Sequence, residues 1–298
     1  MNTNTIMHGD MPGDKVEIND SHRTKAARIL PVLLEKLEPI RAANPHGRAV
    51  VCVCGGSGVG KSEIASLLGQ ALQDGGLGCY VLSGDNYPHR IPAQNDAERL
   101  RVFRCGALKG LVGSGLYTEE VKNELLDLQR QDVDCDPAQT AGRPWLEVYQ
   151  REGRKALAGY LGSDKEQDFA QLSDIISRFK NGAGSIYLKR MGRTPLDLWY
   201  DRVDFSDKKV LIIEWTHGNS DGFSGVDLPI LLNSTPQETL EHRRSRNRDG
   251  GVDHPFTTMV LEIEQRLLES AAHKAAIIVA KNGDLLTYGQ YRERMARG

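Results

Sequence analysis

Long apolar segments are absent from this sequence. No run approaches the roughly 18 residues that a membrane-spanning helix needs, and residues 1–20 are polar, without the apolar centre of a secretory signal peptide. Charge of one sign is absent too, because 38 basic residues face 40 acidic ones and the net charge is −2. That balance gives no broad electrostatic case for nucleic-acid binding. We therefore expect a globular, cytoplasmic protein that binds neither a membrane nor a nucleic acid.

Cysteine is also scarce. The sequence has five cysteines, and they do not form the paired pattern of a metal site. Cys52 and Cys54 lie on one predicted strand and Cys79 begins another, so we expect reduced, mostly buried thiols. The length of 298 residues allows one large α/β domain with an insertion, or two small domains. Residues 1–20 predict a mobile N-terminal tail, and an amphipathic helix is expected over 22–43.

The most specific motif is Gly55-Gly56-Ser57-Gly58-Val59-Gly60-Lys61-Ser62, which matches the phosphate-binding pattern G-x-x-x-x-G-K-[ST]. An apolar, β-branched run over 48–54 precedes the motif, and apolar residues at helical spacing follow it. In such a strand–loop–helix unit, backbone N–H groups point at a phosphate and Lys61 reaches the β- and γ-phosphates. The Ser62 hydroxyl is expected to ligate Mg²⁺. The motif therefore predicts that the chain binds a nucleoside triphosphate.

Two acidic residues stand at the ends of predicted strands. The strand over 79–83 leads into Gly84-Asp85, and the apolar run over 209–213 ends in Glu214. Ligands of open α/β sheets bind beyond the carboxyl ends of the strands, so we expect Asp85 to act in catalysis, although it could also cap the following turn. Glu214 resembles the acid of a Walker B strand and is predicted to hold Mg²⁺ or to position a water.

Basic residues supply candidates for contacts with anions. His89 and Arg90 follow Asp85 closely, although solvated helix charge is the simpler interpretation of any single one. Residues 90–185 predict a helical, substrate-side insertion. Arg244 and Arg248 share one face of a predicted helix that leads into two glycines. This arrangement is typical of a phosphate-covering lid, which we expect over 240–255, although an exposed charged helix would look similar.

Four stretches, taken in order, resemble the phosphoribulokinase/uridine kinase family of P-loop kinases; they cover residues 55–62, 83–87, 210–218 and 240–249. The resemblance implies an α/β fold of three layers, with a mainly parallel sheet flanked by helices. It also implies that Asp85 is a catalytic base. Trp215 departs from the pattern, because the family usually has glycine after the strand-end acid, and so does the glycine pair at the end of the lid.

The same resemblance suggests where the acceptor binds. An aromatic residue, Tyr87, closely follows the strand-end aspartate, and the basic stretch at His89 and Arg90 is similar to the sugar-phosphate side of the family. Tyr187, shortly before two basic residues, is a further candidate for the substrate side. We therefore include these four residues in the predicted substrate-binding site.

Together these features predict one kinase domain over 21–298 that moves the γ-phosphate of ATP to a hydroxyl of a small molecule. In this hypothesis Lys61 holds the phosphates, Ser62 and Glu214 support Mg²⁺, and Asp85 accepts the hydroxyl proton. Arg244 and Arg248 would neutralise charge on the transferred group. The acceptor stays open between a sugar, a sugar phosphate, a polyol and a nucleoside. Whether the chain forms a homodimer also stays open.

The alternative is a nucleotide-dependent regulatory NTPase or switch protein. Guanine specificity usually accompanies an Asn-Lys-x-Asp stretch after a late strand. Residues 281–284 stand in that place, but their first two residues are in the opposite order. A comparison of ATP with GTP binding separates the two hypotheses.

Overall fold

A six-stranded sheet organises the computed structural model, which describes residues 9–13, 16–194, 196–234, 238 and 254–296. The strand order is β2-β5-β1-β6-β7-β8, and all neighbours are parallel except the edge strand β8. The strands are β1 (Ala49–Gly55), β2 (Cys79–Ser83), β5 (Val210–Glu214), β6 (Leu228–Leu232), β7 (Ile277–Val279) and β8 (Leu285–Leu286).

The register of the sheet brings its functional ends together. Glu214, the last residue of β5, lies opposite Val53 of β1 and Ser83 of β2. The phosphate loop leaves β1 two residues after Val53, and Gly84-Asp85 follows Ser83 directly. All three features therefore meet at one edge of the sheet, as expected for parallel strands whose carboxyl ends coincide.

Two helices cover one face of the sheet: α1 (Asp20–Ala43) and α2 (Lys61–Asp74). Ile29, Leu33 and Leu37 recur at helical spacing on α1 and are fully buried against α2 and alternate residues of the central strands. The helix runs through Pro31 and Pro39 without ending, so neither proline marks a boundary.

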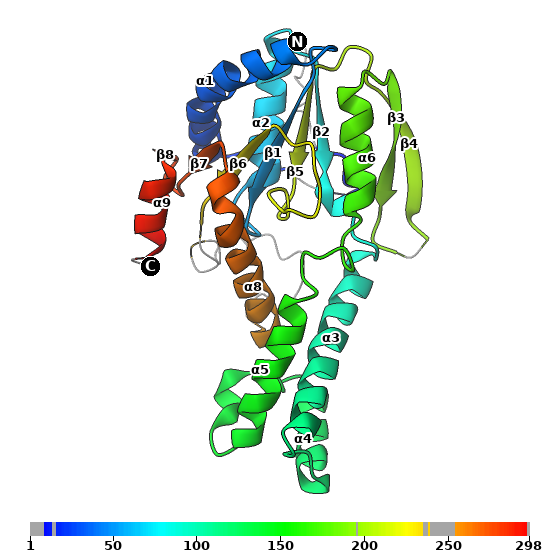
Figure 1. The fold of residues 1–298 in the computed structure, drawn as a ribbon, viewed down its shortest axis with the longest axis vertical. Coiled ribbons are helices and arrows are strands. Elements are labelled where there is room, and N and C mark those ends of the chain that lie inside the picture. Colours follow the sequence, from blue (N-terminus) through cyan, green and yellow to red (C-terminus); the bar gives the residue numbers. More distant parts are fainter. Residues whose placement is uncertain (1–8, 14–15, 195, 235–237, 239–253, 297–298) are drawn as a thin grey trace.

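The opposite face is covered by α6 (Phe169–Lys180), with contributions from α8 (Pro255–Ala271) and α9 (Tyr288–Met295). Outside α6 lies an antiparallel hairpin of β3 (Ser185–Met191) and β4 (Leu198–Asp204), seen at the right of Figure 1. The Arg48 guanidinium donates to the carbonyls of Phe179, Ala183 and Phe205 at 2.7–2.9 Å and thereby ties this layer to β1. The predicted three-layer α/β fold is confirmed.

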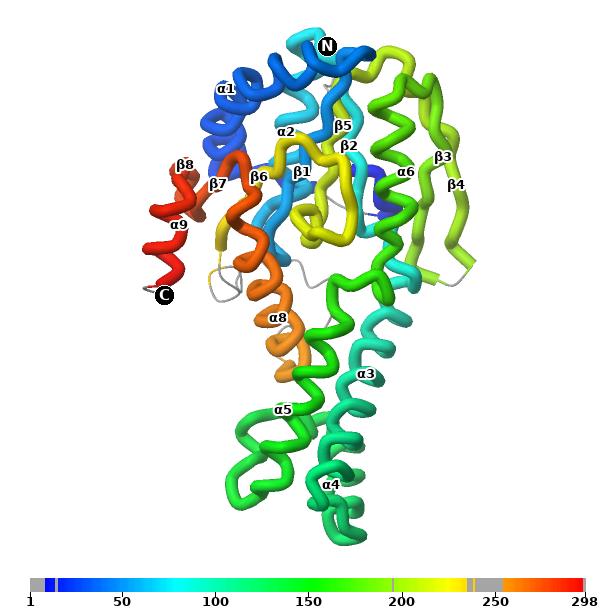
Figure 2. The backbone as a smooth tube through the Cα atoms, in the orientation of Figure 1, coloured from blue at the N-terminus to red at the C-terminus, as the bar shows by residue number. Residues whose placement is uncertain are grey.

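A helical projection extends from the site edge of the sheet, drawn below it in Figures 1 and 2. It consists of α3 (Pro92–Gly113), α4 (Glu119–Arg130) and α5 (Pro144–Ala158), which share a hydrophobic cluster with α8. A Cβ added at Gly106 of α3 would lie 2.2 Å from the Cβ of Ala156 on α5. Only glycine permits this close approach of the two helices. Helices α3 to α6 occupy most of residues 90–185, and the role of this stretch as a substrate-side insertion stays a prediction.

Some features were not predicted. The strands β4 and β8 and helix α9 had no clear signal in the sequence. Residues 9–13 were expected to belong to a mobile tail over 1–20. In the structure they pack against the sheet, because the Asp10 side chain is buried between β2 and β3. The capping box of α1 begins at Asn19. Within the described part of the chain, no helix combines the length and apolar character that crossing a membrane requires. All five cysteines are free, and only Cys105 is exposed.

Candidate active site

The phosphate loop connects β1 to α2. Gly60 is the N-cap of α2 and has a φ of 94°, a conformation that favours glycine; a Cβ there would also approach the His22 ring to 2.8 Å. Among the described residues, no side chain caps the first turn of α2. Its backbone N–H groups are therefore not satisfied by a side-chain cap, and a helix N-terminus of this kind suits a phosphate. Lys61 begins the helix, and its Nζ contacts the Gly56 carbonyl at 3.1 Å.

Glu214 lies beside the loop and is almost completely buried, with 3% of its surface exposed. Its Oε2 accepts a hydrogen bond from Ser62 Oγ at 3.3 Å, and its Oε1 accepts one from Ser83 Oγ. The structure therefore brings together the two predicted metal ligands, one from α2 and one from β5. A hydroxyl and a carboxylate are oxygen donors of the kind that Mg²⁺ prefers.

A cavity of about 580 Å³ opens at this edge of the sheet. Asp85 lines it from the short 3₁₀ turn Gly84–Asn86, and Ser57 and Gly58 line it from the phosphate loop. Most of the remaining lining comes from α3, from the loop after Glu214, from α8 and from the N-terminal segment, and Arg90, Asp132, Gln167 and Arg193 contribute from other loops. One cavity therefore contacts both the predicted phosphate site and the predicted catalytic acid.

The α3 side of the cavity is held by buried ionic contacts. Glu166 accepts hydrogen bonds from Arg99 Nε at 2.6 Å, from Asn95 at 3.1 Å and from the Gly162 N–H at 2.7 Å. Burial alone would raise the pKa of Glu166, but Arg99, His217 and the Gly162 N–H hold it below its usual value. Arg99 also lies 3.6 Å from Glu264 of α8, whose pKa is raised by burial. This network joins α3 to α8 across the cavity.

The structure separates the predicted substrate residues into two groups. Arg90 lines the cavity and contacts the Tyr160 hydroxyl at 3.1 Å. Tyr87 does not reach the cavity: it is fully buried in the core, with Lys189 over its ring. His89 is exposed and contacts the Asp164 carbonyl, and Tyr187 is 60% exposed on β3. Neither lines the cavity.

The positions of Tyr87 and Tyr187 outside the cavity follow from the local geometry of the chain. Tyr87 comes directly after the 3₁₀ turn that carries Asp85, and burial raises the pKa of its phenol. Tyr187 alternates outward on a strand whose neighbours Ile186 and Leu188 point into the core. Arg244 and Arg248, the predicted lid arginines, lie outside the described residues.

Several residues of the site were not predicted as such. His217, in the loop after Glu214, lines the cavity, and burial lowers its pKa to about 4. Glu264 and Met11 line the cavity from opposite ends of the sequence. A loop that directly follows a strand-end acid is a signal for His217. Neither Met11 nor Glu264 carries a local signal, because the fold alone brings them to the site.

No family model matches this chain. It is 37% identical over 253 residues to a bifunctional alpha-galactosidase/sucrose kinase of Mediterraneibacter gnavus, a match that covers 85% of this chain. The chain spans only 22% of the length of that relative. It is also 25% identical to an adenylyl-sulfate kinase of Lactiplantibacillus plantarum, over 80% of this chain and 89% of the relative.

A solved structure, that of the protein YGR205w, superposes with a TM-score of 0.50 at 10% identity and covers 88% of this chain and 96% of its own. The fold and the phosphate loop define a P-loop protein. Both curated relatives are kinases by name, in whole or in part, in agreement with the kinase family that the motifs of this chain resemble.

Proposed function

We propose that this chain transfers the γ-phosphate of ATP to a hydroxyl group of a small molecule, with a neutral sugar as the best candidate. The observation that carries the proposal is the shared cavity, which contacts Ser57 and Gly58 of the phosphate loop and also Asp85. Donor phosphate and acceptor hydroxyl can meet there, and phosphoryl transfer depends mainly on such positioning and on electrostatic stabilisation.

The nucleotide side fits a triphosphate. The first turn of α2 has no side-chain cap among the described residues, and Gly60 allows the backbone to turn toward a ligand. Lys61 would exchange its contact with the Gly56 carbonyl for the β- and γ-phosphates. The N–H groups and Lys61 together would hold the phosphates against the repulsion of their own charges.

A magnesium ion also fits this edge of the sheet. Ser62 and Glu214 would hold it, either directly or through water, and their side chains already lie 3.3 Å apart. Among the described residues no cluster of three or more His, Cys, Asp or Glu side chains forms a closed metal site. In kinases Mg²⁺ usually keeps water and phosphate oxygens among its ligands, so it does not require such a cluster. When bound, the ion would neutralise charge on the phosphates.

Asp85 is proposed as the general base. It is exposed on the turn after β2 and lines the cavity, so an acceptor hydroxyl can reach its carboxylate. The carboxylate would orient that hydroxyl and accept its proton as the oxygen bonds to phosphorus. Arg244 and Arg248 of the proposed lid at 240–255 would stabilise the transferred group, and closure of such a lid would exclude water.

The acceptor class follows from the lining and from the relatives. Three arginines and four acidic residues contribute to the described lining, so it has no surplus of positive charge for a phosphorylated acceptor. Arg99 is already paired with Glu166. The relative at 37% identity is named a sucrose kinase in part. We therefore favour a neutral, polyhydroxylated acceptor, with helices α3 to α5 forming the substrate-side insertion.

An acceptor screen tests the proposal. The protein is incubated with Mg·ATP and, separately, with sucrose, monosaccharides, a sugar phosphate, a nucleoside, glycerate and adenylyl sulfate, and ADP release is followed. We expect ADP release to depend on a neutral sugar, with a phosphorylated product. Equal release with and without every acceptor would instead support the regulatory NTPase alternative. Strong preference for GTP over ATP would support it further.

A further inference from the structure

The N-terminal segment 9–13 follows an unexpected course for residues so near the chain end. It lies along the ends of β2 and β5, at the same edge of the sheet as the phosphate loop. A Cβ added at Gly9 would lie 3.5 Å from Glu214 Oε1. Two residues later, Met11 lines the cavity. The segment thus passes from the proposed metal side to the proposed acceptor side.

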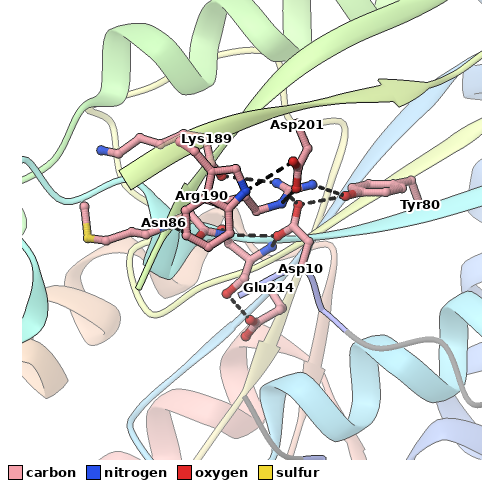
Figure 3. A network of polar contacts seen from close by, with 10 residues as sticks. Asp10, Tyr80, Asn86, Lys189, Arg190, Asp201 and Glu214 are labelled. Atoms are coloured by element: carbon pink, nitrogen blue, oxygen red, sulfur yellow. Dashed lines mark hydrogen bonds and ion pairs between the residues drawn. The ribbon is translucent and has the colours of Figure 1, made fainter. Parts of the chain in front are cut away.

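Asp10 anchors this segment through both of its carboxylate oxygens (Figure 3). Oδ1 accepts from the Ser83 N–H at 2.7 Å and from Asn86 Nδ2 at 3.0 Å. Oδ2 accepts from the Tyr80 hydroxyl at 2.9 Å and from Arg190 at 2.8 Å. With 9% of the Asp10 side chain exposed and 7% of the Arg190 side chain, this ion pair is buried.

The partners of Asp10 belong to three different elements. Tyr80 and Ser83 are on β2, Asn86 is on the turn that carries Asp85, and Arg190 is on β3 of the hairpin. Asn86 in turn accepts from the Met191 N–H at 3.0 Å, which joins the same turn to β3. Ser83 donates to Glu214. One buried carboxylate therefore fixes the residues on either side of Asp85 relative to the hairpin.

We propose that Asp10 is a positioning residue of the acceptor site. It connects the Asp85 turn to the β3–β4 hairpin, and it holds Met11 in the wall of the cavity, where Met11 determines acceptor specificity. The inference rests on the proposed function, since it concerns the acceptor half of that site. It assigns a role to a segment that carries no motif. Arg190 has a second acidic partner, Asp201, at 3.1 Å, but 53% of that side chain is exposed, so its removal should matter much less.

The kinetic test compares Asp10→Asn with the matched control Asp201→Asn, which removes the other carboxylate from the same arginine. In the full chain we expect Asp10→Asn to lower kcat/KM for the acceptor about 10- to 100-fold, since small misplacements cost this much. KM for ATP should stay within about twofold, because the phosphate loop is not touched. Asp201→Asn should change neither kcat/KM for the acceptor nor KM for ATP by more than about twofold. Met11→Ala should alter acceptor preference and leave KM for ATP unchanged.

Three outcomes would overturn the inference. Asp10→Asn could lower the melting temperature but leave all kinetic constants unchanged, which would make the contact merely structural. Removal of residues 1–13 could raise turnover, which would make the segment an inhibitory plug. Asp201→Asn could match Asp10→Asn in its effect on the acceptor, which would remove the special role of the buried carboxylate.

A second measurement does not depend on the proposed function. Hydrogen exchange is measured on residues 84–91 and 189–193 of the wild type and both variants, together with Tyr80→Phe, a milder change to the same network. We expect Asp10→Asn to accelerate exchange in both stretches at once and Asp201→Asn to leave residues 84–91 unchanged. Unchanged exchange in Asp10→Asn would contradict the inference. If Asp10→Asn accelerates exchange in both stretches but ADP release by the wild type does not depend on any acceptor, only the proposed function is contradicted.

Discussion

The two sides of the cavity are built by different kinds of contact. The nucleotide side is largely local: β1, the phosphate loop and the start of α2 are consecutive in sequence, and Glu214 joins them from β5. The acceptor side is assembled from distant parts, with Asp10, Arg99, Glu166, Arg190 and Glu264 joined across as many as 180 residues of sequence. The comparison teaches that donor binding is encoded by a motif and acceptor binding by the fold.

This difference predicts that damage to the acceptor side appears first as lost stability. Glu166→Gln removes one charge from a pair in which the Glu166 side chain is fully buried, and it leaves Arg99 with Glu264 and the exposed Asp96 as acidic partners. We expect a loss of about 3–5 kcal/mol in the free energy of unfolding, the usual cost of breaking a buried pair. Urea denaturation measures it.

The control for that variant is Glu124→Gln. Glu124 pairs with Arg143 on the surface of the helical projection, with about a third or more of each side chain exposed. An exposed pair should contribute less than about 1 kcal/mol. Equal losses for the two variants would show that the buried network does not hold the acceptor side.

Damage to the nucleotide side should appear as lost ligand binding with the fold intact. Lys61→Ala removes the cation that would contact the β- and γ-phosphates. We expect transfer to fall about 100- to 1,000-fold, as for the loss of one preorganised charge-stabilising group. ATP should also lose most of its effect on the melting temperature. Lys155→Ala, on exposed surface of α5, is the matched control, and an equal effect there would refute the assignment.

The pH dependence of stability probes the junction of the two sides. His217 is buried between them, near Glu166, Arg99 and Lys61, and burial lowers its pKa to about 4. The folded protein therefore holds His217 neutral, whereas the unfolded chain binds a proton below about pH 6.5. The contribution of neutral His217 to the free energy of unfolding is complete above pH 6.5. It is lost as the pH falls toward 4, by on the order of 3 kcal/mol at most.

Denaturation between pH 7 and 4 measures this loss. His217→Asn should flatten the acid side of the stability curve. His273→Asn, at an exposed site on the short 3₁₀ helix after α8, should leave the curve as it is in the wild type. A wild-type slope that survives in His217→Asn would assign the acid sensitivity to other groups.

The sequence predicted the nucleotide side well and the acceptor side poorly, for a physical reason. A phosphate loop must place two glycines, a lysine and a hydroxyl at fixed spacing, so the pattern itself carries the chemistry. The strand-end acids Asp85 and Glu214 follow the same logic, because parallel strands end together. Their positions were therefore accessible before the fold was known.

No such rule fixes the acceptor side. Tyr87 was assigned to the substrate side from the family resemblance, because it closely follows Asp85, yet it is fully buried in the core. Asp10 looked like part of a tail because its partner Arg190 lies 180 residues away. The β4 strand escaped prediction because nearly all of its side chains are exposed and its sequence lacks apolar alternation. These features depend on tertiary contacts that periodicity does not record.

One measurement tests the central claim that the cavity joins donor and acceptor at Asp85. Acceptor-dependent ADP release and nucleotide affinity are determined for Asp85→Asn, with Asp174→Asn on the exposed face of α6 as the control. Loss of a general base costs about 100- to 10,000-fold, and we expect that loss in turnover with nucleotide affinity within about twofold of wild type. Full turnover in Asp85→Asn, or an equal loss in Asp174→Asn, would contradict the account.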